Sequence, residues 1–158
     1  MRFRPLHALA TLACLALAAC SGGMVKRVSE PAAAIQQLTV GNDGHWNVEL
    51  RLRNYSSMPM RFDDVALAMK VGDEAAGTLH ATPGLSIGPE SADIVTIRLQ
   101  PTSPARIVMA DALAGGSALF YELEGSVKAT PEDKKQRSFE VKSRNSLNQA
   151  PGLPGVLR

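Results

Sequence analysis

Hydrophobic and polar residues alternate through most of the chain between residues 35 and 144, which is the pattern of strands with one buried face. The clearest case runs from His45 to Arg53, where a slip of one residue in register would bury two arginines. Its apolar face is made by Trp46, Val48, Leu50 and Leu52. Similar alternation predicts strands over residues 35–40, 62–71, 76–81, 95–99, 119–127 and 137–143.

The pattern changes after residue 102, where a short helix is predicted. Ser103 and Pro104 suit an N-cap and a first helical position, residues 107–109 and 113 provide an apolar face, and Gly115-Gly116 ends the helix. Seven or so antiparallel strands with one short helix predict an all-β fold, an immunoglobulin- or fibronectin III-like sandwich. Trp46 is expected at the interface of its two sheets.

The N-terminus has the pattern of an export signal. Arg2 and Arg4 precede an apolar run from Leu6 to Ala19, which is shorter than the roughly 20 residues that a membrane-spanning helix needs. The residues Leu17-Ala18-Ala19-Cys20 resemble the lipobox of bacterial lipoprotein signal peptides at all four positions. That resemblance implies cleavage of residues 1–19, lipidation of Cys20, and, with Ser21 next to it, anchoring on the periplasmic side of the outer membrane.

Composition narrows the function classes. Of 158 residues, 45% are hydrophobic and 20% are charged, which disfavours a disordered acidic tail, and the net charge of +2 disfavours a nucleic-acid binder. Neither Cys14 nor Cys20 would remain free in the mature chain, so packing alone must hold the fold. We expect a flexible tether over residues 20–34, the domain over 35–144, and a Pro- and Gly-containing flexible tail over 145–158.

The region from about Pro31 to Leu147 resembles the late embryogenesis abundant (LEA) type 2 family, also called LEA14-like or the water stress and hypersensitive response domain. The likeness is one of order: a strand ending at Asn54, a strand and hairpin over 65–81, a Gly/Pro loop before 95–99, the aromatic strand 119–125, and a last strand over 137–143. The family often has Asn-Pro where this chain has Asn54-Tyr55, so the rigid proline turn is missing.

This resemblance implies a fibronectin-like sandwich and a non-enzymatic, protective role in desiccation and other envelope stress. Some members of the family are proposed to bind lipid, and the family defines no catalytic residues that could be carried over. The alternatives are an envelope module that binds lipid and a subunit that docks on an envelope protein through a strand edge or its tail.

Side chains that could do chemistry are few. Only His45 and His80 remain after signal removal, and adjacent carboxylates such as Asp63-Asp64 point to opposite faces of a strand, so we expect no metal site, cofactor or catalytic residue. The chain also lacks a Gly-x-Ser-x-Gly elbow and a P-loop. Basic clusters at 26–27, 51–61 and 134–137 fit either anionic lipid headgroups or an ordinary solvated surface.

A lipid groove is the one binding site that the sequence suggests. Met58 and Met60 in a turn, with Ile107 and Met109 on the helix, could line an apolar groove for an acyl chain, because methionine adapts to irregular guests. The same residues could instead fill the core. The expected partners are thus a membrane through Cys20 and either a lipid or an envelope protein, but no nucleic acid.

Overall fold

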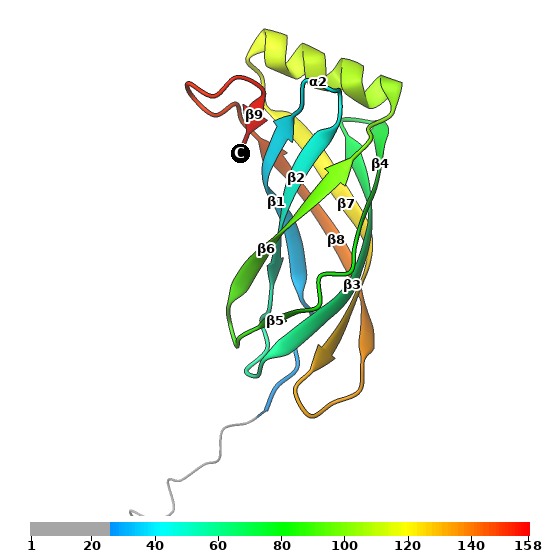
Figure 1. The fold of residues 1–158 in the computed structure, drawn as a ribbon, viewed down its shortest axis with the longest axis vertical. Coiled ribbons are helices and arrows are strands. Elements are labelled where there is room, and N and C mark those ends of the chain that lie inside the picture. The colour runs from blue at the N-terminus through cyan, green and yellow to red at the C-terminus, as the bar shows by residue number, and fades with distance from the viewer. Residues whose placement is uncertain (1–25) are drawn as a thin grey trace, which may run out of the picture.

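A computed structural model describes residues 26–158, which form two packed antiparallel sheets with a helix across one end (Figure 1). The predicted sandwich is therefore confirmed. The first sheet has the order β6 (Ala92–Leu99), β2 (Trp46–Arg53), β1 (Ala32–Val40), β9 (Val156–Leu157). The second has the order β4 (Glu74–Ala81), β3 (Met60–Val71), β7 (Leu119–Pro131), β8 (Arg137–Leu147), and β5 (Leu85–Ile87) also pairs with β3.

The alternating pattern determines which face of each strand is buried. In β2 the four apolar residues predicted to face inward are all buried, and the strand lies between β1 and β6. In β3 the register shifts between Phe62 and Asp64, so that Phe62 and Val65 both point into the core. The bend predicted at Asp63-Asp64 is thus a β-bulge, since one extra residue restores the inward face.

The space between the sheets is filled by the chain's own side chains. Thirty apolar residues form one continuous buried cluster. Its largest fully buried members are Trp46, Tyr121 and Phe62. A close-packed interior of this kind makes each core side chain part of the stability of the whole domain.

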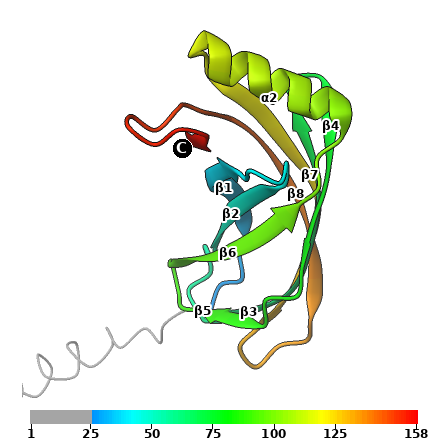
Figure 2. The same cartoon turned by 45° about the horizontal axis from the view of Figure 1, so that its top comes forward.

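The helix α2 (Ser103–Gly115) packs on the ends of β3 and β4, as Figure 2 shows with that end turned forward. Two details differ from the prediction. The N-cap is Thr102, whose hydroxyl accepts from the Ala105 N–H at 3.3 Å, and the buried face consists of Ala105, Met109 and Ala112. Ile107 lies on the opposite face and is 63% exposed, because the helical period places it about 160° from Met109.

The two ends of the predicted domain also differ from the structure. β1 begins at Ala32, inside the expected tether, and β8 continues to Leu147. The expected flexible tail instead turns back through Gly152 and Gly155, so that β9 pairs with β1 and the Leu157 side chain is fully buried. A two-residue strand behind a Pro- and Gly-containing turn is too short to show any alternation in the sequence.

The buried residue Asn54 organises the loop after β2. Its side-chain amide donates to the backbone carbonyls of Met58, Ile87 and Gly88 at 2.8, 3.1 and 2.9 Å. Its carbonyl oxygen accepts from the Ser56 N–H at 2.8 Å. One side chain therefore joins the β2–β3 and β5–β6 loops, although the residue that follows it is Tyr55 and not a proline.

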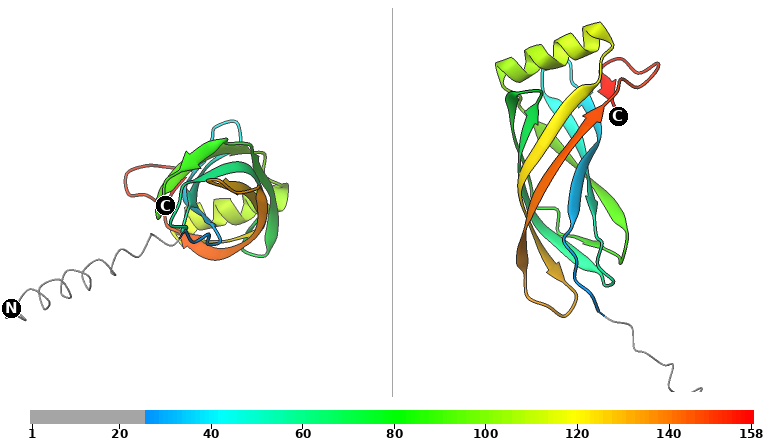
Figure 3. Two further views of the ribbon diagram at one scale, coloured as in Figure 1. Left: turned by 90° about the horizontal axis from the view of Figure 1, so that it is seen from below. Right: turned by 180° about the vertical axis from the view of Figure 1, so that it is seen from behind.

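The long axis of the molecule has two distinct ends (Figures 1 and 3). The segments 26–30, 53–59, 88–91 and 131–137 form the tether end, where the described chain begins. The helix end carries α2 and the C-terminus. The twelve residues of β3 run from one end to the other and span about 40 Å. Within residues 26–158, α2 is far too short to cross a membrane, and no other helix is described that could do so.

Candidate interaction surfaces

The four residues proposed to line a lipid groove do not come together. Met58 and Met60 are buried at the tether end, where Met60 pairs with Ile87 of β5 and Pro131 of β7. Ile107 and Met109 belong to α2 at the opposite end, and of these two only Ile107 is exposed. The three methionines thus take the second role that the sequence allowed, as part of the protein's own interior.

An apolar patch covers part of the helix end. Ile107 and Phe120 are 63% and 64% exposed, unusually high for such large apolar side chains. Val108, which follows Ile107 on the helix, is half-buried and lines a groove together with Phe120. A shallow groove of about 290 Å³ runs between α2 and the start of β7. Its lining is mostly apolar or small: Gly72, Val108, Asp111, Ala112, Ser117, Ala118, Leu119 and Phe120. Such a surface can bind an apolar side chain of another molecule.

Phe120 is the residue of this patch that the sequence interpretation missed. It was counted only as part of the aromatic strand 119–125, and the strand over 137–143 was the one expected to close the sandwich. The alternating pattern predicts that Phe120 is exposed, because Leu119 and Tyr121 are buried and the residue between them must face outward. A phenylalanine on the polar face of a strand is a better indication of an interaction surface than any of the four groove residues.

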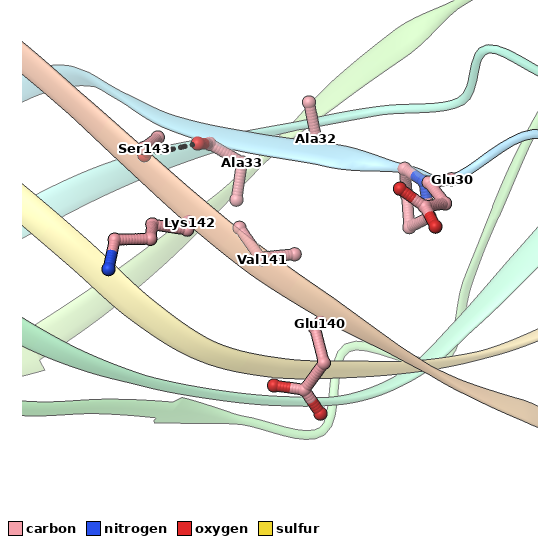
Figure 4. Close-up of a pocket in the computed structure, with 8 residues that line it drawn as sticks. Glu30, Ala32, Ala33, Glu140, Val141, Lys142 and Ser143 are labelled. Carbon is pink, nitrogen blue, oxygen red and sulfur yellow. Dashed lines mark hydrogen bonds between the residues drawn. The ribbon is translucent and has the colours of Figure 1, made fainter.

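A second depression lies along the seam between β1 and β8 (Figure 4). It has a volume of about 320 Å³, with Ala33 and Val141 in its wall and Glu30 and Glu140 toward one end. Hydrogen bonds close the seam: the Ser143 hydroxyl donates to the Ala33 carbonyl at 3.1 Å. The Ile35 N–H likewise donates to the Tyr121 hydroxyl oxygen at 3.0 Å. These bonds satisfy backbone groups of β1 and hold β1 against the second sheet, so the residues of the seam have a structural role.

Burial raises the pKa of the Tyr121 hydroxyl, and the hydrogen bond from the Ile35 N–H opposes this shift without cancelling it. The phenol is therefore neutral at physiological pH and acts here as a hydrogen-bond partner. It has no histidine or carboxylate among the hydrogen-bond partners described for it.

His45 lies in the turn before β2 and His80 lies on β4, each beside a carboxylate. His45 Nδ1 is 3.4 Å from Asp43 Oδ2, and His80 Nε2 is 3.4 Å from Asp64 Oδ1. The backbone N–H of His45 donates to Asp43 Oδ1 at 3.1 Å and lowers the pKa of the Asp43 carboxyl. Within the described part of the chain, no group of three or more His, Cys, Asp or Glu side chains is placed to hold a metal ion.

Asp63, at the bulge of β3, has the most extensive set of partners of any carboxylate described. Burial acts to raise its pKa, but hydrogen bonds from Thr130 and Gln136 at 2.6 and 3.0 Å and the Arg61 guanidinium at 2.7 Å outweigh burial and lower it. The charged form is thus favoured in the folded state. The contribution of the Asp63 carboxylate to the stability of the fold is therefore present above about pH 4 and is lost as pH falls through the lowered pKa.

The tether end is a third surface, on which several loops meet at the start of the described chain. Lys26 Nζ lies 3.1 Å from Asp133 in the β7–β8 loop. The Arg27 N–H donates to the Ser57 hydroxyl at 2.8 Å, and its guanidinium donates to the Tyr55 carbonyl at 3.4 Å. Two adjacent residues therefore bring together loops from both sheets.

No protein-family model and no curated protein matches the chain. Among solved structures, the chain is similar to AT1g01470 from Arabidopsis thaliana, with 11% identity and a TM-score of 0.50 over 82% of this chain and 84% of that one. The chain is also similar to At2g46140.1, a protein proposed to be a LEA protein, with 10% identity and a TM-score of 0.49 over 90% of this chain and 86% of that one. A protein from Archaeoglobus fulgidus has 14% identity and a TM-score of 0.42 over 78% of this chain and 100% of its own. At such identities the likeness to AT1g01470 shows the fold alone: a two-sheet antiparallel sandwich.

Proposed function

We propose that this chain is a non-enzymatic LEA14-like lipoprotein, anchored through Cys20 on the periplasmic side of the outer membrane, that protects neighbouring envelope components during desiccation and related stress. One observation carries the protective role: the interior is filled by the domain's own side chains, while charged residues follow the outward faces of both sheets. A rigid domain of this kind can cover its neighbours with a polar surface and needs no bound ligand. The lipobox and the order of the strands support the anchoring and the family.

The test compares Cys20→Ser with Cys14→Ser in the producing bacterium. We expect the wild type and Cys14→Ser in the membrane fraction, with an N-terminal peptide heavier by a diacylglycerol and an acyl chain, and Cys20→Ser in the soluble fraction. A deletion strain should survive drying less well, and wild-type protein should restore survival more fully than Cys20→Ser. Unchanged survival after deletion would overturn the protective role, and an unmodified Cys20 would overturn the anchoring.

A second function, docking on an envelope protein, is favoured by the patch of Ile107, Val108 and Phe120. The filled core favours docking over carriage of a lipid inside the sandwich. Exposed aromatic anchors beside a groove are typical of residues that dominate binding energy. The docking partner would cover the end of the domain farthest from the anchor.

This second function predicts that Phe120→Ser weakens binding by at least about 2 kcal/mol, roughly thirtyfold, while the free energy of unfolding changes by less than about 0.5 kcal/mol. A photoreactive residue at Ile107 in living cells should give an adduct of one defined mass, which Phe120→Ser abolishes. The matched control places the same residue at Thr96, on the exposed face of β6. Identical adducts from both positions, or none from Ile107, would contradict docking at the helix end.

A further inference from the structure

The tether end carries basic side chains that have no acidic partner. Within the segments that form it, six residues are basic and four are acidic. Lys26 and Arg27 lie near Asp133 and Glu90, at 3.1 and 4.0 Å. The remaining cations are Arg53, Lys134 and Lys135 in the β7–β8 loop, and Arg137 at the start of β8. All four are exposed and form no ion pair within residues 26–158.

An exposed aromatic ring lies at the same end. Tyr55 is 42% exposed, and the Arg53 guanidinium lies over its ring at 4.9 Å from the centroid. Tyrosine is enriched at the level of lipid headgroups, where its ring meets apolar atoms and its hydroxyl meets water. The basic residues Lys142 and Arg144 of β8 differ from these cations, because they form ion pairs with Glu124 and Glu122 of β7.

The anchoring proposed above would place this end near a membrane. Lys26 follows Cys20 by six residues, which can span at most about 20 Å. Because Lys26 and Arg27 contact the β7–β8 and β2–β3 loops, both loops are held at that short distance from a lipidated Cys20. Basic residues so close to an anionic leaflet are attracted to it once they come within a Debye length, about 8 Å at physiological salt.

We propose, on the basis of the anchoring proposed above, that the tether end lies against anionic phospholipid headgroups. Lys134, Lys135 and Arg137 make the electrostatic contacts, and Tyr55 lies at the level of the headgroups. Glu30 and Glu132 remain at the rim, where they limit the attraction. The domain then stands upright, and β3 holds the patch around Phe120 about 40 Å from the headgroups.

The experiment uses the exported chain carrying Cys20→Ser, so that no lipid anchor contributes. Sedimentation with vesicles should show binding to phosphatidylcholine mixed equally with phosphatidylglycerol, weaker binding at physiological than at low salt, and little binding to phosphatidylcholine alone. The triple variant Lys134→Gln, Lys135→Gln, Arg137→Gln should bind the anionic vesicles at least about tenfold more weakly. Tyr55→Ser should weaken binding at both salt concentrations, because the ring contributes apolar contact.

A matched triple, Lys70→Gln, Arg106→Gln and Arg158→Gln, removes the same charge from exposed positions outside the tether end. It should bind within about twofold of the parent chain, and urea unfolding should show that all variants fold. An equal loss in both triples would show attraction to net charge alone and would overturn the proposed orientation, as would absence of binding at low salt. The mass of the wild-type N-terminal peptide tests anchoring separately, so either proposal can fail without the other.

Discussion

Asn54→Asp is expected to lower the free energy of unfolding by about 4 kcal/mol at neutral pH, one of the two largest effects predicted for this chain. The substitution keeps the shape of the side chain but replaces an NH₂ donor with oxygen. That oxygen would face the carbonyls of Met58, Ile87 and Gly88, which the amide now contacts at 2.8–3.1 Å. A buried carboxylate, for which the Ser56 N–H is the one donor retained from the described contacts of Asn54, then adds its desolvation cost to the hydrogen bonds lost with the amide.

The pH dependence separates this mechanism from a general loss of packing. Burial and the three carbonyls should raise the pKa of the introduced carboxyl, so the deficit relative to wild type should shrink as pH falls and the group is protonated. Urea unfolding between neutral pH and pH 4 measures this. The control Asn145→Asp retains an oxygen for the Ser146 N–H at an exposed position and should change stability by less than about 0.5 kcal/mol. A small or pH-independent effect at Asn54 would contradict the proposed role of its amide.

Asn54 also illustrates which features of the structure could be predicted from the sequence and which could not. Its position at a strand end was a point of resemblance to a family, and the polar turn after it was predicted. Its three carbonyl partners lie as far as 34 residues away in the chain, in a loop that no local pattern connects to it. Long-range hydrogen bonds of this kind depend on how strands are ordered, which alternation does not specify.

Period-two alternation predicted the long strands because their buried and exposed faces differ over eight or more residues, as in β2 and β3. It could not predict β5 or β9, which have three and two residues. The buried side chain of Leu157 was therefore assigned to a flexible tail. In the helix, the cluster of apolar residues at 107–109 suggested a single buried face, but alanines at 105 and 112 provide it together with Met109.

The predicted groove failed for a related reason. Met58 and Met109 share a residue type that suits lipid binding, but only the fold determines that a strand of about 40 Å separates them. Phe120, in contrast, could have been identified from its place on the outward face of β7. The sequence can thus predict which face of a strand carries a side chain. It cannot predict which distant segments of the chain meet to form a site.

Gly125→Ala is expected to lower the free energy of unfolding by about 3 kcal/mol, and Gly125→Val by more. Gly125 lies in the middle of the second sheet, where β7 pairs with β3 and β8 and Gly125 is opposite Leu67 and Val141. An added Cβ would lie 2.2 Å from the Ala66 carbonyl oxygen and 3.1 Å from the Leu67 Cα. Both neighbours are backbone atoms of a paired strand, so the clash can be relieved only by separating β3 from β7.

Gly88→Ala provides the matched control, because the nearest atom to its added Cβ is the Ser91 hydroxyl oxygen at an ordinary 3.7 Å. Its unfolding in urea should stay within about 1 kcal/mol of wild type. If Gly125→Ala were equally mild, the close approach of β3 and β7 would not exist in solution. A large loss confined to Gly125 would instead explain why the strand from Leu119 has a glycine at its centre, where propensity alone would favour a β-branched residue.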